Sequence, residues 1–279
     1  SPREAIKRMT EIKKMNSRLF EFGDQKWVPE WYHDGLHDYL LFFYRTFSYH
    51  KLWREDLEHF IESEKNEFVL ECCAGLGECL PMVLEDSSVL QRNHKRVLFS
   101  DLFPHKRAVE KFKDSNFYSY CSFSVDATEV PKSLETSKVF INSFHHLNPK
   151  VAKKVLLDSI ESNNRVLVLE YVSNSIVAYL TMVCGASLTF VTLPFVVQRK
   201  NLFFSAFFTY IVPLFPIMLL WDGLVSCFRH YSLKEIKKLL GAENANLDFT
   251  MNQKRSLFLP SGVSAILIKP KKEVQQKAA

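Results

Sequence analysis

Strand-like and helix-like segments alternate over residues 66–172, and this alternation restricts the chain to a small set of folds. The strand-like runs are EFVLEC, RVLFSD, YSYCSFSV, KVFINSF and RVLVLEYV, and amphipathic stretches separate most of them. Strands that alternate with helices predict βαβ units and a mostly parallel sheet. NLDFTMNQK and VSAILIKP are candidate strands of a closing antiparallel hairpin. We therefore expect a doubly wound, Rossmann-like α/β fold with a seven-stranded sheet.

The first strand-like run continues into a glycine-containing loop, VLECCAGLGE. Gly75 and Gly77 let the backbone turn tightly and let a ligand approach it. The following helix would offer free N–H groups to that ligand. The loop is neither a P-loop nor a complete GxGxxG motif, because Leu80 replaces the third glycine and no Lys-Ser/Thr pair follows. A purely structural turn explains the loop almost as well, so the loop alone does not indicate a function.

The ends of the next three strands add residues of the kind that bind ligands. Asp101 ends the second strand and can accept hydrogen bonds from ribose hydroxyl groups. Asp126 and the small Ala127 follow the third strand, where a flat base could lie. INSFHHLNP closes the fourth strand with polar side chains. Open α/β sheets bind ligands at the carboxyl ends of their strands, so we expect a ligand site at this edge.

Together these segments resemble the class I S-adenosylmethionine-dependent methyltransferases. The loop at residues 69–78 looks like the glycine motif that cradles the methionine part of the cofactor, and Asp101 matches the acid that binds ribose. The family pattern is E/D-x-G-x-G-x-G, whereas this chain has Cys73 at the first glycine. FEFGDQKW, SDLFP and FHHL are also similar to a poorly characterised bacterial branch with an apolar insertion after strand five. The resemblance implies S-adenosyl-L-methionine as the cofactor, bound by Glu71, Ala74, Gly75, Gly77, Asp101, Leu102, Asp126, Ala127, Asn142 and Phe144.

The resemblance also places the segment after the fourth strand beside the transferred methyl group. His145 and His146 are therefore the candidate catalytic residues, although either ring could instead pack against or cap the next helix. Methyl transfer is an in-line displacement from a sulfonium, for which the protein mainly supplies proximity, alignment and a dry pocket. A general base is needed only where the acceptor must lose a proton. Glu170 and Tyr171, at the end of the fifth strand, are candidate substrate residues, with a helix cap or a buried hydrogen bond as the alternative.

The alternation stops at an apolar insertion, residues 172–221, whose only charges are Arg199 and Lys200. Its two uncharged arms have 22 and 20 residues, so each is long enough for a membrane span. Carrying two cations across a bilayer is costly, and prolines at three positions interrupt regular helix. We expect a hairpin that dips into one leaflet. A hydrophobic cap over a lipophilic pocket is the second alternative, and complete transmembrane helices are the third. Asp222 follows the insertion and is a further substrate candidate, unless it pairs with Arg229.

The charge distribution and the cysteines limit the partners and the compartment that we expect for this protein. The net charge of +5 lies mostly in residues 1–18, and residues 4–19 are expected to form a basic amphipathic helix suited to an anionic membrane surface. No platform of basic and aromatic residues stands out, so no nucleic-acid partner is expected. The six cysteines include no CxxC pair, which predicts reduced thiols, no metal site and a catalytic domain on a reducing, cytoplasm-like side of the membrane.

These observations divide the chain into an N-terminal helical lid region (1–65), a cofactor-binding core (66–172), the apolar hairpin (173–221), closing elements (222–270) and a tail (271–279). The expected function is methyl transfer from S-adenosylmethionine to a small lipophilic acceptor at a membrane surface, with membrane lipid as a partner. A catalytically degenerate subunit of a membrane complex stays open as an alternative. An aminopropyltransferase is disfavoured, because it needs acidic residues for a polyamine and NSFHHL has none.

Overall fold

The computed structural model describes residues 19–257 and 259–271, which form two compact units. The helical unit contains the described residues up to Leu52 together with Tyr171–His230 and Lys254–Val263. The sheet unit contains Trp53–Glu170, Tyr231–Gln253 and the described residues from Ser264 onward. The basic helix expected at residues 4–19 falls almost entirely outside the described residues.

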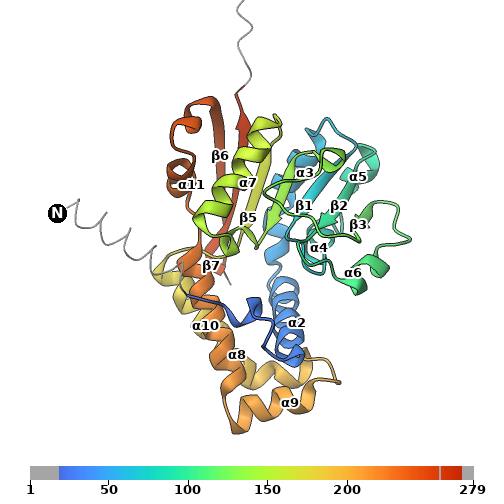
Figure 1. The fold of residues 1–279 in the computed structure, drawn as a ribbon. Coiled ribbons are helices and arrows are strands. Elements are labelled where there is room, and N and C mark those ends of the chain that lie inside the picture. Colours follow the sequence, from blue (N-terminus) through green and yellow to red (C-terminus); the bar gives the residue numbers. More distant parts are fainter. Residues whose placement is uncertain (1–18, 258, 272–279) are drawn as a thin grey trace, which may run out of the picture. The chain divides into compact units, whose positions relative to one another are not determined.

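A seven-stranded sheet in the order β3-β2-β1-β4-β5-β7-β6 is the centre of the sheet unit, although the end of β6 and the start of β7 belong to the helical unit (Figure 1). The strands are β1 Phe68–Cys72, β2 Arg96–Ser100, β3 Tyr118–Tyr120, β4 Lys138–Ile141, β5 Val166–Glu170, β6 Leu247–Ser256 and β7 Leu259–Pro270. Strands β1 to β5 pair in parallel, and β7 runs antiparallel to β5. The expected doubly wound, mostly parallel sheet with a closing hairpin is confirmed.

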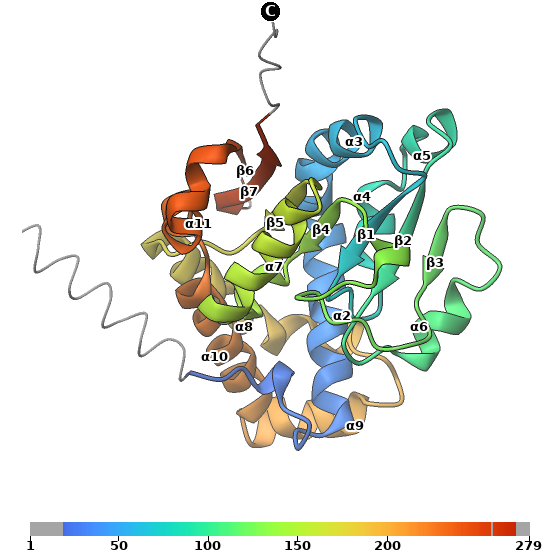
Figure 2. The same ribbon diagram turned by 45° about the horizontal axis from the view of Figure 1, so that its top comes forward.

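Helices cover both faces of this sheet (Figure 2). On one face, α7 Pro149–Glu161 and α11 Leu233–Leu240 pack on each other and share a buried cluster with β1, β4, β5 and β7. Leu70 and Cys72 of β1 belong to this cluster, because alternate residues of a strand point to the same face. The shorter helices are α3 Arg54–Glu62, α4 Cys79–Val83, α5 Val89–Arg92 and α6 Lys106–Lys111.

Two local expectations needed correction. The sequence of residues 78–91 predicts a single helix after the first strand. The structure interrupts it between α4 and α5, where the Arg54 side chain donates to the Val83 carbonyl at 3.2 Å and pairs with Asp86 at 3.2 Å. A carbonyl freed at a helix end needs such a donor, so Arg54 stabilises the interruption. The third strand is also shorter than expected, since β3 ends at Tyr120. Ser232 and Glu235 have the spacing of a capping box, and the structure forms this box at the start of α11.

The helical unit is built from α2 Glu30–Thr46, α8 Ile176–Val196, α9 Leu202–Ala206, the π-helical turn η5 Phe207–Ile211 and α10 Leu214–Arg229. α8 packs against both α10 and α2. The second apolar arm is not one straight helix, because the axis bends by 88° between Leu202–Ile211 and Leu214–Arg229. Pro213 lies at this bend, whereas Pro194 is accommodated near the end of α8.

The 3₁₀ turns of the two units are η1 Phe22–Asp24, η2 Tyr49–Trp53, η3 Lys132–Leu134, η4 Phe144–His146 and η6 Gly241–Asn246.

Candidate functional site

The loop after β1 turns through three residues with left-handed backbone conformations. The φ angles are 56° at Cys73, 55° at Gly75 and 65° at Gly77. Hydrogen bonds close the turn, from Gly77 N to Ala74 O at 2.8 Å and from Ala74 N to Ser100 O at 3.0 Å. Cys73, which takes the place of the first glycine in the family pattern, therefore adopts a conformation that glycine reaches at little cost.

The two glycines of this loop have different surroundings. A Cβ atom placed on Gly75 would meet no described atom within 4 Å, so open space lies over that part of the backbone. A Cβ atom on Gly77 would lie 3.0 Å from the ring of Phe112 and 3.2 Å from that of Phe99. Tyr120 also supports the loop, because its hydroxyl donates to Gly75 O at 2.6 Å. A ligand can therefore approach Gly75, whereas Gly77 allows close packing beneath the loop.

Asp101 joins the ends of β1 and β2. Its carboxylate accepts hydrogen bonds from Gly75 N at 3.0 Å and from Phe103 N at 2.9 Å, one on each oxygen. A carboxylate oxygen has a second lone pair, so both oxygens can still accept from ribose hydroxyls. The sequence predicts Asp101 as a ligand-binding carboxylate, but it does not predict the hydrogen bond between Asp101 and the glycine loop.

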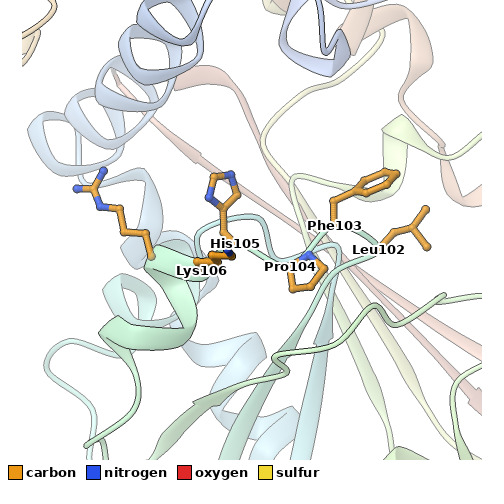
Figure 3. A pocket seen from close by; sticks show the side chains of 6 residues that line it. Leu102, Phe103, Pro104, His105 and Lys106 are labelled. Atoms are coloured by element: carbon orange, nitrogen blue, oxygen red, sulfur yellow. The ribbon is translucent and has the colours of Figure 1, made fainter.

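An open hollow of about 560 Å³ begins directly after Asp101 and is lined by residues 102–107. Leu102 and Phe103 are exposed there, beside His105, Lys106 and Arg107. Figure 3 shows the Phe103 and His105 side chains projecting separately from the loop, with Leu102 pointing to one side. The sequence predicts Leu102 as a cofactor residue, and the SDLFP segment also contains Phe103 and Pro104, whereas the basic residues 105–107 carry no such signal.

Glu71 is a buried carboxyl group near the end of β1. Its Oε2 atom has no hydrogen-bond partner among the described residues. Burial raises the pKa of Glu71 to about 8, because the apolar surroundings disfavour the charged form. An unpartnered buried carboxyl group next to a ligand loop suits a cationic partner such as an ammonium group.

The residues after β3 form a local turn. Asp126 is exposed and accepts from Thr128 N at 2.8 Å. This backbone bond, followed by a bond to the Thr128 hydroxyl, holds the pKa of Asp126 below its ordinary value. Ala127 is partly buried against the main core cluster. The structure thus places a small side chain and a carboxylate together after β3, as the sequence suggested, and their ligand role stays a prediction.

The segment after β4 turns sharply at Asn142, which has a φ of 49°. Ser143 is buried, and its Oγ atom has no hydrogen-bond partner among the described residues. Phe144 is fully buried in the core, where its ring contacts those of Phe140 and Tyr231 edge-on. The surroundings of Phe144 favour a packing role over the expected contact with cofactor.

His145 and Glu170 form a buried pair at the ends of β4 and β5. His145 Nδ1 lies 2.7 Å from Glu170 Oε2, and His145 N donates to Glu170 Oε1 at 3.1 Å. Each side chain is only 3% exposed. His146 is exposed, and its ring centroid lies 4.3 Å from that of His145. From the sequence, His145 and His146 are catalytic candidates and Glu170 is a substrate candidate, but the pairing of His145 with Glu170 is not predicted.

The two remaining candidates belong to the helical unit. The ring of Tyr171 packs edge-on against that of Tyr44, with centroids 5.7 Å apart. Asp222 is buried on α10 and accepts from Phe22 N at 2.6 Å, Gly23 N at 2.8 Å and Tyr32 Oη at 2.9 Å. These contacts fasten the N-terminal segment to α10.

The alternative of an Asp222–Arg229 ion pair is wrong. Arg229 Nη1 instead lies 3.2 Å from both Glu21 and Asp24. Asp222 and Arg229 are seven residues apart on one helix, about 10 Å along the axis, so their side chains bind different groups of the N-terminal segment instead of each other.

No protein-family description matches the chain, and no curated protein matches it. Among solved structures, the plantazolicin methyltransferase BpumL in complex with SAH aligns with 95% of this chain and 98% of that chain, at a TM-score of 0.56 and 9% identity. The chain has a methyltransferase fold. At this identity the likeness is one of fold, and it agrees with the fold expected from the strand ends and the glycine loop.

Two further structures are similar at lower scores. BpumL in complex with a triazolic desmethylPZN analog and SAH aligns with 95% of this chain and 99% of that chain, with 10% identity and a TM-score of 0.49. A putative O-methyltransferase from Nostoc punctiforme aligns with 96% of this chain and 68% of that chain, with 15% identity and a TM-score of 0.46.

Proposed function

We propose that this protein transfers a methyl group from S-adenosyl-L-methionine to a small lipophilic acceptor at a membrane surface. The observation that carries the proposal is the geometry after β1 and β2 on a methyltransferase fold. Open space lies over the Gly75 backbone, and the Asp101 carboxylate is bonded directly to that glycine. This combination offers a closely approachable backbone and a hydrogen-bond acceptor at one sheet edge, where α/β folds bind nucleotide-like ligands.

The residues present fit S-adenosylmethionine. Glu71 supplies an unpartnered buried carboxyl group for the ammonium of the methionine part, and Asp101 supplies acceptors for the ribose hydroxyls. When bound, the cofactor supplies an electrophilic methyl group on a sulfonium. We assign the cofactor to residues 66–172, with contacts from Ala74, Gly75, Gly77, Leu102, Asp126, Ala127 and Asn142.

Cys73 bears on the alternative of a catalytically degenerate subunit. Its φ of 56° is a glycine-like conformation, so the replacement of the first pattern glycine leaves the turn in place. Gly75 N and Asp101 remain hydrogen-bonded across the loop. The departure from the family pattern therefore gives little support to a lost cofactor pocket.

The side chains of the helical unit support a lipophilic acceptor and a membrane surface. On α8 most of the exposed residues are large and apolar, with Ile176 77%, Val191 71% and Phe195 88% exposed, whereas the buried ones include Ala186 and Thr189. Soluble monomers rarely expose a continuous apolar surface of this kind, and small residues at helix contacts with apolar residues outside are typical of lipid-facing helices. A bilayer or a lipophilic ligand would cover this surface.

The polar groups of α8 are compatible with lipid. Thr181, Ser187 and Thr192 each donate a hydroxyl hydrogen bond to the carbonyl four residues earlier in the same helix. Hydroxyls satisfied in this way expose no unbonded donor to a surrounding apolar medium. An interface with another protein ordinarily has a polar rim around its apolar centre. The apolar surface of α8 therefore favours lipid as the covering medium.

The connection between the apolar arms favours a hairpin that dips into one leaflet. In the part of the chain that the structure describes, α8 is the one helix long and apolar enough to cross a bilayer by itself, and the second arm is bent by 88°. Lys200 Nζ lies 2.6 Å from Asp34, and Gln198 donates to Asp38 from both its backbone and its side chain, at 3.1 and 2.9 Å. The polar turn is therefore tied to α2 rather than free to pass through a membrane.

Calorimetric titration of the purified protein with S-adenosylmethionine and with its demethylated product tests the cofactor assignment. We expect both to bind, whereas a degenerate subunit would bind neither. Incubation with methyl-labelled cofactor and a total lipid extract then tests transfer, and we expect label in the organic phase. Cofactor binding without labelled lipid would contradict the lipophilic acceptor while leaving the cofactor site intact.

Flotation with phosphatidylcholine vesicles tests the membrane surface separately. Phe204 in α9 and Phe123 in the sheet unit are matched, with 52% and 53% exposed. Full burial of a Phe side chain is worth about 1.5–3 kcal/mol, and about half of the Phe204 side chain is left to bury. Phe204→Ser should therefore cost about 1 kcal/mol and weaken vesicle binding by roughly fivefold. Phe123→Ser should leave vesicle binding unchanged. A wild-type protein that stays with the aqueous fraction, or equal effects of the two substitutions, would count against a membrane role for the helical unit.

A further inference from the structure

We infer that His145 and Glu170 form a proton-accepting pair and that the methyl acceptor is an acidic hydroxyl group, such as that of a lipophilic phenol or enol. The inference rests on the proposed function, because it names the acceptor of the same methyl transfer. His145 would be the catalytic residue, and Glu170 would be a positioning residue that acts through His145.

The pair is held on adjacent strands. β4 and β5 are paired in parallel, so the turn that follows β4 lies beside the last residue of β5. Glu170 binds His145 twice, through the backbone N–H at 3.1 Å and through Nδ1 at 2.7 Å. Two bonds from one carboxylate fix both the position of the residue and the orientation of its ring.

The contact at Nδ1 determines what the other ring nitrogen can do. An ionised carboxylate accepts only, so a bond to Glu170 requires a hydrogen on Nδ1 of His145. In the neutral ring, Nε2 then carries the lone pair and can accept a proton. A buried carboxylate also stabilises the imidazolium that forms after proton transfer, and this is its role in hydrolytic triads.

Other features of this turn indicate that a polar ligand approaches the pair. Ser143, two residues earlier, is buried and leaves its Oγ without a partner among the described residues. Buried hydroxyls are normally hydrogen-bonded, so this orphaned group indicates a missing polar partner. The exposed His146 ring lies against that of His145, which places the buried pair one ring away from solvent.

The reaction balances without a further reactant. The acceptor O–H gives its proton to His145 Nε2 while an oxygen lone pair forms the new O–CH₃ bond. The C–S bond breaks with its electron pair passing to sulfur, so the sulfonium becomes a neutral thioether. The imidazolium later releases its proton to water. An imidazole takes protons effectively from acidic hydroxyls such as phenols and enols rather than from alkanols, and a carboxylate or a neutral amine acceptor would need no base at all.

Nitrogen NMR of the histidine side chains tests the pair directly. We expect the neutral ring of His145 to carry its hydrogen on Nδ1. In Glu170→Gln this N–H should lose its bond to a carboxylate, which would change the chemical shift of Nδ1. A ring protonated at Nε2 instead would overturn the inference, whatever the activity of the protein.

A matched acceptor series tests the chemistry. Para-octylphenol, para-octylbenzoate and para-octylaniline share one apolar group and differ in whether the acceptor atom must lose a proton before or during attack. We expect the wild-type protein to methylate the phenol. Methylation of only the benzoate or the aniline, or of none of the three by cofactor-bound protein, would overturn the acidic-hydroxyl acceptor. Absence of cofactor binding would instead overturn the proposed function.

Substitutions then separate catalysis from structure. His145→Gln and Glu170→Gln should each lower kcat for the phenol by about 100-fold or more, while the Kd for S-adenosylmethionine stays within about twofold. Glu170→Asp, which keeps the charge, should recover part of the loss. His59→Asn, an exposed histidine of α3, is the control and should leave kcat unchanged. A Glu170→Gln variant with unchanged kcat, or one that loses cofactor affinity in parallel with kcat, would contradict the positioning role.

Discussion

Replacing Cys73 by glycine tests whether the loop after β1 holds a strained residue at a glycine position. Cys73 has a φ of 56° and packs, partly buried, against the main core cluster. Cys73→Ala and Cys73→Gly both remove the sulfur atom, so comparing these two variants isolates the effect of the backbone. The comparison needs no assumption about the packing of the thiol.

The expected difference follows from two opposing terms. A left-handed conformation costs a residue with a Cβ atom about 1–2 kcal/mol. The greater freedom of glycine in the unfolded chain costs about 0.4–1 kcal/mol relative to alanine. Cys73→Gly should therefore be more stable than Cys73→Ala by roughly 0.5–1 kcal/mol, measured as the free energy of unfolding in urea.

Cys72 provides the matched control. This neighbouring residue is fully buried in β1 and paired in the sheet opposite Ser100. Glycine within a strand costs about 0.5–1 kcal/mol relative to alanine, so the order should reverse and Cys72→Gly should be the less stable variant. If glycine were the less stable choice at both positions, the left-handed turn at Cys73 would be refuted.

Three further predictions concern the same edge of the sheet. The pKa of Glu71 rises from 4.5 to about 8 on folding, so the folded protein holds an extra proton between these values and loses about 1.4 kcal/mol of stability per unit as the pH rises through that window. Glu71→Gln should abolish this loss, which urea titrations at a series of pH values would reveal. Asp101→Ala should abolish measurable cofactor binding, because each lost charge-assisted hydrogen bond is worth about 1.5–3 kcal/mol, and a calorimetric Kd within about threefold of wild type would contradict this. Gly77→Ala should lower the melting temperature more than Gly75→Ala, since the added Cβ would lie 3.0 Å from Phe112 at the first position and meet no described atom within 4 Å at the second.

The sheet could be predicted from sequence because its signals are local. The buried parallel strands appear as short apolar runs, and the residues that follow them appear in chain order at one edge. The Ser232–Glu235 capping box was equally visible, since both partners lie within one helical turn. Such features depend on neighbours in the sequence, and the structure retains them.

Features that depend on distant residues could not be found in this way. Arg54 stabilises the end of α4 from 29 residues away, and Phe22 meets Asp222 across 200 residues. The His145–Glu170 pair lies between these cases, because its two residues end strands that are neighbours in the usual strand order. Combining the strand order with the residues at each strand end would have indicated that pair from the sequence.

The contact between Tyr32 and Asp222 has a consequence for how the chain assembles during synthesis. These residues are 190 positions apart, so α2 is made long before the helix that completes its packing. Strands β1 to β5 all lie between the two and can begin to pair first, whereas the helical unit must wait for α8 and α10. Contacts of such long range form late, and unpartnered apolar segments are prone to aggregate while they wait. The apolar helices α2 and α8 would therefore stay without their final partner until α10 has been synthesised.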